Sequence, residues 1–131
     1  PFSYLGVFMK TTTFGTILMI HLNLSLRITH QSATAISKAM GITQSSFQRS
    51  LSGDAELTVS RMYDFCHHAD VSAAYLTQLS CEAAELLKGN GWTIVEKTEQ
   101  DDLLTLWKTR DQWSWEIPIG DIFKKAAGKV R

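Results

Sequence analysis

The stretch SATAISKAMGITQSSFQRSLSG, residues 32–53, predicts two short helices joined by a tight turn. Ala33–Met40 carries its apolar residues at the spacing that gives a helix one apolar face. Gly41 follows at the position where a helix can end in the left-handed conformation, which glycine adopts most easily. Thr43 is a good N-cap for a second helix over Gln44–Ser52. The stretch therefore predicts a helix-turn-helix unit around which the rest of the chain is arranged.

The second predicted helix has an apolar side and a polar side. Phe47 and Leu51 are four residues apart, so they point inward together. A helix face that is only solvated usually carries paired Glu and Lys. This outer face is almost uncharged and offers amides, hydroxyls and one guanidinium, from Gln44, Ser45, Gln48, Arg49 and Ser52. Such groups read base edges and phosphates in the major groove of DNA, and the alternative is an ordinary helical hairpin in a small helical domain.

GITQSSFQRSLSG, residues 41–53, resembles the turn and recognition helix of the lambdoid phage repressor and Cro class of helix-turn-helix proteins. The resemblance rests on the turn glycine, the aliphatic residue after it, the cap, the first residue of the helix, the buried aromatic and the closing glycine: Gly41, Ile42, Thr43, Gln44, Phe47 and Gly53. Ser50 departs from the family, which normally buries an aliphatic residue there, and Ser37 stands where the family usually has alanine. ELTVSRMYDFCHHADVSAAYL, residues 56–76, is similar to the fourth and fifth helices of that fold. Together the resemblance covers about residues 14–79.

The polar face and this resemblance together indicate a sequence-specific DNA-binding transcriptional regulator, a repressor that binds a palindromic operator as a homodimer. We expect Gln44, Ser45 and Gln48 to contact base edges, and Arg49 to contact guanine or phosphate. Gln31, Ser32 and Lys38 are expected at the DNA backbone, beside the N-terminus of the first motif helix. The complete set of expected DNA-binding residues is Gln31, Ser32, Lys38, Thr43, Gln44, Ser45, Ser46, Gln48, Arg49 and Ser52.

Helical patterns surround the motif on both sides. The apolar stretch 14–28 predicts a first helix, which is too short to cross a membrane and carries His21, Asn23 and Arg27. Its surplus apolar surface could contact a partner chain. Further helices are expected after the motif, over residues 57–68, 72–78 and 80–88. The sequence GNG at 89–91 marks a boundary.

Beyond that boundary the pattern changes to short alternating runs at 92–96, 103–108 and 113–117. They predict a three-stranded antiparallel sheet followed by a short helix over 121–127, and hence an α+β fold with a repressor-like domain of five or six helices. The expected organisation is an N-terminal extension (1–13), a DNA-binding domain (14–89) and a dimerisation segment (90–131). The natural start could be Met9. Four tryptophans could cover the sheet against the helical domain or form the dimer interface, which we favour: Trp92, Trp107, Trp113 and Trp115.

Charge, cysteine content and the absence of known motifs limit the functions that the sequence suggests. The chain has 13 basic and 13 acidic residues, so only a local basic patch could bind DNA. Cys66 and Cys81 are expected to be buried thiols of a cytoplasmic protein. Cys66, His67 and His68 are consecutive on a helix and point about 100° apart, so we expect no metal site. The chain contains no catalytic motif, and we expect neither an enzyme nor a cofactor.

Two other functions stay open. A protein-binding module, such as an antitoxin or a phage-type antagonist, would use the apolar first helix or the tryptophan-rich sheet. It predicts that alanine at Gln44 and Gln48 leaves activity intact, whereas changes at Trp113 or Trp115 abolish activity. A ligand-responsive regulator would hold a small molecule on the aromatic sheet, although no polar group of the sequence identifies one.

Overall fold

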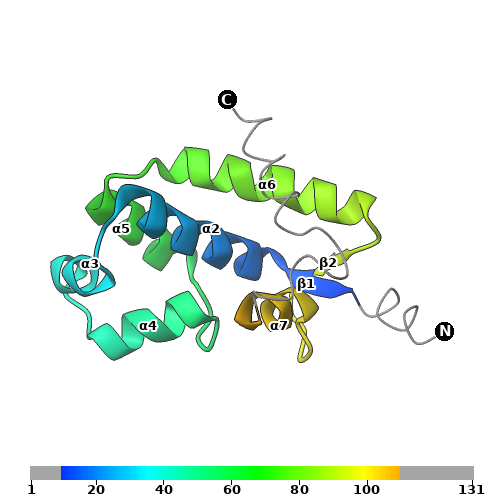
Figure 1. The fold of residues 1–131 in the computed structure, drawn as a ribbon, viewed down its shortest axis with the longest axis horizontal. Helices are drawn as coiled ribbons and strands as arrows, with labels where there is room; N and C mark the ends of the chain where they lie inside the picture. Colours follow the sequence, from blue (N-terminus) through cyan, green and yellow to red (C-terminus); the bar gives the residue numbers. More distant parts are fainter. Residues whose placement is uncertain (1–9, 110–131) are drawn as a thin grey trace.

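The computed structural model describes residues 10–109 of the 131-residue chain. This part contains six helices and two short strands (Figure 1). In chain order the elements are β1 (Thr11–Thr13), α2 (Phe14–Thr29), α3 (Ala33–Met40), α4 (Gln44–Ser52), α5 (Val59–Ala69), α6 (Ala73–Gly89), β2 (Thr93–Val95) and α7 (Asp102–Lys108).

The predicted three-stranded antiparallel sheet is wrong. The strand expected within 92–96 forms as β2, but it pairs in parallel with β1, in the register Thr11 with Thr93 and Thr13 with Val95. The second expected strand, 103–108, is the helix α7. Asp101 caps this helix by accepting a hydrogen bond from the Leu104 amide at 3.0 Å, and Leu103 and Trp107, four residues apart, are both buried. The expected elements at 113–117 and 121–127 lie outside the described residues.

Two expected helices, 72–78 and 80–88, are one continuous helix, α6. The second helix was expected to begin at residue 80, but the Ser80 hydroxyl donates to the Leu76 carbonyl oxygen, 2.9 Å away, inside the helix. Neither Gly nor Pro interrupts the segment, so nothing ends the first helix at Gln78. The chain leaves α6 at Asn90, and Gly91 then adopts a positive φ of 90°.

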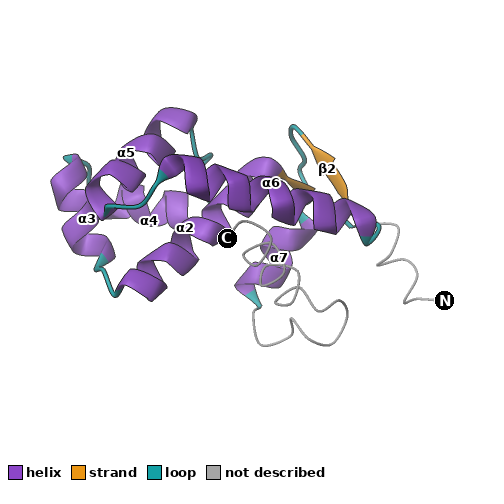
Figure 2. Ribbon diagram, turned by 90° about the horizontal axis from the view of Figure 1, so that it is seen from above, coloured by secondary structure: helices purple, strands orange, loops and turns teal. Residues whose placement is uncertain are grey.

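The core consists of two clusters of buried side chains that share helix α2. Leu18 and Leu22 of α2 pack toward α3, α4 and α5, while Ile17 and Ile20 pack toward α6 and α7. Figure 2 shows α6 lying along α2. The buried residues of α2 are Thr16–Leu22, whereas Leu24 and Leu26 are half-buried and Ile28 is 76% exposed. The packing within the chain therefore covers the first half of the apolar surface of α2 and leaves part of the second half exposed.

Trp92 and Trp107 belong to the second of these groups, with about 4% of each side chain exposed. For these two residues the structure favours the alternative of packing against the helical domain. Trp113 and Trp115, the other residues expected in a dimer interface, lie outside the described residues.

Candidate nucleic-acid interface

The helix-turn-helix forms as predicted. Ser32 caps α3, and Gly41 ends it with a φ of 73°. The Ile42 amide then donates to the Ser37 carbonyl oxygen at 3.2 Å, which closes the turn. Thr43 caps α4, because its hydroxyl accepts a hydrogen bond from the Ser46 amide at 3.1 Å. The geometry of the two helices is therefore fixed by local hydrogen bonds that the sequence encodes.

Helix α4 buries one side and exposes the other. Phe47 and Leu51 are buried, and the Phe47 ring stacks on Phe65 of α5 with centroids 5.6 Å apart. The exposed side chains of α4 are Gln44, Ser45, Gln48 and Arg49. The expected base-reading face is therefore free of contacts with the core.

Arg61 of α5 contacts the side of α4 that faces the protein. Its Nη1 atom lies 3.3 Å from the Ser46 hydroxyl oxygen and 3.2 Å from that of Ser50. This contact explains the small polar residue at position 50, because an aliphatic side chain there would remove an acceptor. It also directs the hydroxyl of Ser46 toward α5. Ser46, which was expected to bind DNA, therefore makes a contact within the protein, with Arg61.

The residues expected at the DNA backbone take three different positions. Gln31 is half-buried and donates from Nε2 to the Ala69 carbonyl oxygen, 2.6 Å away, so it ties the start of α3 to the end of α5. Ser32 is exposed and its hydroxyl caps α3. Lys38 is exposed near the end of α3. Lys38 is thus the member of this group whose side chain is fully available.

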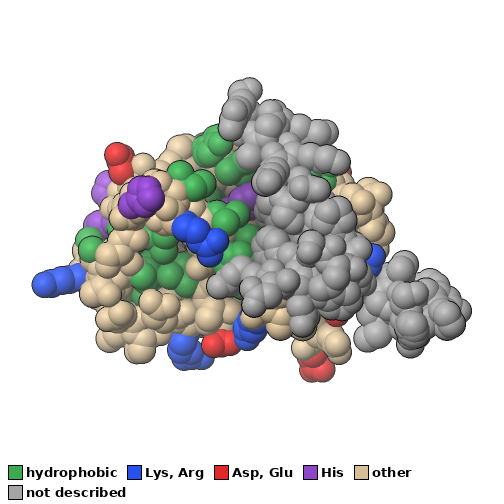
Figure 3. All heavy atoms as spheres, in the orientation of Figure 1, with side chains coloured by type: hydrophobic (Ala, Val, Ile, Leu, Met, Phe, Trp, Pro, Cys, Tyr) green, Lys and Arg blue, Asp and Glu red, His purple; other side chains and the backbone are tan. Residues whose placement is uncertain are grey.

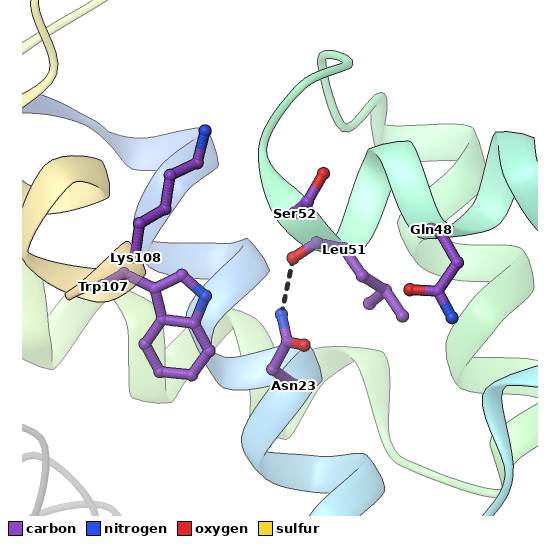
Figure 4. Close-up of a pocket in the computed structure, with 6 residues that line it drawn as sticks. All are labelled: Asn23, Gln48, Leu51, Ser52, Trp107 and Lys108. Carbon is purple, nitrogen blue, oxygen red and sulfur yellow. Dashed lines mark hydrogen bonds between the residues drawn. The ribbon is translucent and has the colours of Figure 1, made fainter. Parts of the chain in front are cut away.

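The C-terminal end of α4 is held by two residues that the sequence analysis did not select. Asn23 of α2 donates from Nδ2 to the Leu51 carbonyl oxygen at 2.9 Å (Figure 4). Lys108 of α7 pairs with Asp54, which follows α4, with 3.2 Å between Nζ and Oδ1. Asn23 could have been selected, because a lone asparagine within an apolar helix is conspicuous in the sequence. Lys108 could not be selected in this way, because its segment was expected to form a strand.

A depression of about 310 Å³ lies at this end of α4 and is lined by Asn23, Gln48, Leu51, Ser52, Trp107 and Lys108. In Figure 3, basic and acidic side chains lie next to each other along the lower edge of the molecule, below α4 and α7. The pKa of Asp54 is lowered by the hydrogen bond from the Ser52 hydroxyl and by Lys108. The carboxylate therefore stays charged beside the exposed face of α4.

Cys66 and Cys81 differ in burial. Both cysteines are free, Cys66 buried as expected but Cys81 exposed, and burial raises the pKa of the Cys66 thiol. Within residues 10–109, no three side chains of the types His, Cys, Asp and Glu lie together as a metal site. In the same range, no helix has the length and apolar composition to span a membrane.

Comparison with known proteins gives no matching family model, no matching curated protein and no matching solved structure.

Proposed function

We propose that this chain is a sequence-specific DNA-binding transcriptional regulator, a repressor that binds a palindromic operator as a homodimer in the cytoplasm. The observation that carries the proposal is the exposed outer face of α4. Its amides and hydroxyls stand on a helix whose opposite side is anchored by Phe47, Leu51 and Arg61. The resemblance of residues 41–53 to the lambdoid repressor and Cro class supports the same function.

The chemistry of this face suits the major groove, which admits one α-helix. Gln44 and Gln48 are one helical turn apart, and a glutamine amide can form two hydrogen bonds to adenine. Ser45 would contact a neighbouring base edge, and Arg49 would contact guanine or a phosphate. Lys38 would bind the backbone from α3, which in this motif crosses the phosphates.

The overall charge of zero does not oppose this function, because operator binding needs cations only at the interface. Lys38 and Arg49 supply one exposed cation on each motif helix. A dimer doubles both, and two-fold symmetry matches an inverted repeat. Trp113 and Trp115 remain the residues that we propose for the dimer contact.

The test is selection from a pool of random duplex DNA, combined with a measurement of oligomeric state. We expect a dimer that enriches an inverted repeat with half-sites about one helical turn apart. No enrichment at low salt, where even weak phosphate binding is visible, would contradict the proposal. A protein-binding function would then become the better hypothesis, and retained activity of a Gln44→Ala, Gln48→Ala double variant would support it.

A further inference from the structure

Helix α7 lies beside the C-terminal end of α4, although half of the described chain separates them in sequence. A Cβ atom added at Gly53 would come within 2.6 Å of Leu104 Cδ1, so the two segments approach as closely as glycine allows. Trp107 and Lys108 then line the same depression as Gln48 and Ser52. The last turn of α7 therefore lies at the C-terminal end of the proposed reading face, across the depression from Gln48.

This neighbour is rigidly attached. Leu103 is fully buried and Trp107 is 4% exposed, both in the cluster that α2 and α6 form. The Asp101 carboxylate accepts hydrogen bonds from the hydroxyls of Thr12 and Thr16, which joins the start of α7 to β1 and α2. Lys108 thus extends from a fixed helix whose position relative to α4 is set by the core.

Lys108 has a weak partner. Its Nζ lies 3.2 Å from Asp54 Oδ1, but 49% of its side chain and 57% of that of Asp54 are exposed. Exposed ion pairs of this kind contribute little to stability because water and salt screen them. In Figure 4 the ammonium group of Lys108 and the hydroxyl of Ser52 extend toward the same side of the depression. A phosphate approaching α4 could therefore exchange places with the Asp54 carboxylate.

We propose that Lys108 is a DNA-backbone contact from outside the helix-turn-helix, and that Asp54 competes with the phosphate for its ammonium group. The inference rests on the proposed function. It places one further cation at the C-terminal end of α4, across the depression from Gln48 and far from the turn that carries Thr43. The interface then has phosphate contacts at both ends of the reading helix, from Lys38 and from Lys108.

The test compares single variants for binding to the enriched operator across a range of salt concentrations. Lys108→Ala should reduce the salt slope by about one for each bound protomer, which is on the order of tenfold weaker binding at 0.1 M salt for one site. The preferred sequence should not change, because a phosphate contact carries no base information. Asp54→Asn should strengthen binding, because it frees the ammonium group.

The two variants separate DNA contact from folding. Both break the same ion pair, so a purely structural role would shift stability and binding in the same direction for both. Lys88→Ala is the matched control, because Lys88 forms a similar exposed pair with Glu85 at 3.0 Å. It lies on α6, across α2 from α4 (Figure 1).

Three results would decide whether Lys108 contacts the DNA backbone. Opposite shifts for Lys108→Ala and Asp54→Asn, with Lys88→Ala unchanged, support the contact. A wild-type protein that binds its operator while Lys108→Ala behaves like Lys88→Ala overturns this inference alone. A wild-type protein that binds no duplex overturns it together with the proposed function.

Discussion

Single polar side chains hold together segments that are distant in the sequence. Asp101 caps α7 and also accepts a hydrogen bond from the Thr12 hydroxyl, 2.7 Å away, and one from Thr16. Thr12 is fully buried, so the carboxylate satisfies a hydroxyl that water cannot reach. One residue thereby joins β1, α2 and α7.

Asp101→Ala should lower the free energy of unfolding by about 2–4 kcal/mol, because it removes a cap and leaves buried hydroxyls without their acceptor. Denaturant unfolding measures this change. The matched variant is Thr58→Ala, which removes only the cap of α5, a bond of 3.0 Å from the Arg61 amide. It should cost about 1 kcal/mol. Equal losses for the two variants would contradict the wider role of Asp101.

His21 should make stability depend on pH. Burial on α2, where 4% of the side chain is exposed, lowers the pKa of His21 from 6.5 to about 4. Between these values the unfolded chain binds the proton and the folded chain does not, so the free energy of unfolding falls as the pH falls. We expect a loss of about 2 kcal/mol between pH 7 and pH 5.

Denaturant unfolding of the wild type and of His21→Leu at the two pH values isolates this contribution. The free energy of unfolding of the wild type, minus that of His21→Leu, should fall by about 2 kcal/mol from pH 7 to pH 5, because only the wild type loses stability through this group. Parallel losses in both proteins would assign the pH dependence to other residues.

At the scale of elements, α4 is positioned by contacts from α2, α5 and α7. Asn23 donates one hydrogen bond to the Met19 carbonyl oxygen of its own helix and one to the Leu51 carbonyl oxygen of α4, each at 2.9 Å. Arg61 holds the middle of α4 through Ser46 and Ser50. Helix α4 is thus fixed through its backbone and its inner hydroxyls, which leaves the outer side chains available.

Asn23→Asp should destabilise the protein more than Asn23→Ala. The aspartate would place a carboxylate against two carbonyl oxygens and cannot donate, whereas alanine only leaves the Leu51 oxygen without this donor. We expect a loss of about 1 kcal/mol for alanine and of about 2–3 kcal/mol for aspartate. Thermal unfolding would show the order, and an Asn23→Asp protein as stable as the wild type would contradict the contact.

The motif helices could be predicted because their signals are local. Ser32, Gly41 and Thr43 cap or end helices within a few residues, so the bounds of α3 and α4 were predicted correctly. Helix α7 was missed because LLTLWK, residues 103–108, is a short apolar run that fits a strand or a helix. The decisive contacts of Asp101 come from β1 and α2, which are about ninety residues away in the sequence. The pairing of two three-residue strands has no local signal at all.

The candidate site, like the motif helices, was predictable where its signals are local in the sequence. The exposed face of α4 followed from helical spacing around Phe47 and Leu51. The inward position of Ser46 did not, because it depends on where Arg61 of α5 lies. Lys108 could not be selected, since its place beside α4 depends on how α7 packs on the core.

At the scale of the whole molecule, α2 is the common support of both core clusters. The helix-turn-helix packs on one side of it and α6 with α7 on the other. This arrangement brings Lys108 beside the C-terminal end of α4. A chain with no net charge can in this way still gather cations at one local surface. The proposed operator contact is therefore made by a motif and by one residue that a later helix adds.

The ratio between operator binding and non-specific binding tests the central claim most directly. It should be measured for the wild type, for Gln44→Ala with Gln48→Ala, and for a control with alanine at the exposed Gln78 and Gln100. Each lost base contact should cost about 1–3 kcal/mol of operator binding, while binding to unrelated duplex should change little. We predict that the Gln44 and Gln48 double variant loses most of this ratio and that the control keeps it. An unchanged ratio in the double variant would show that α4 does not read the operator.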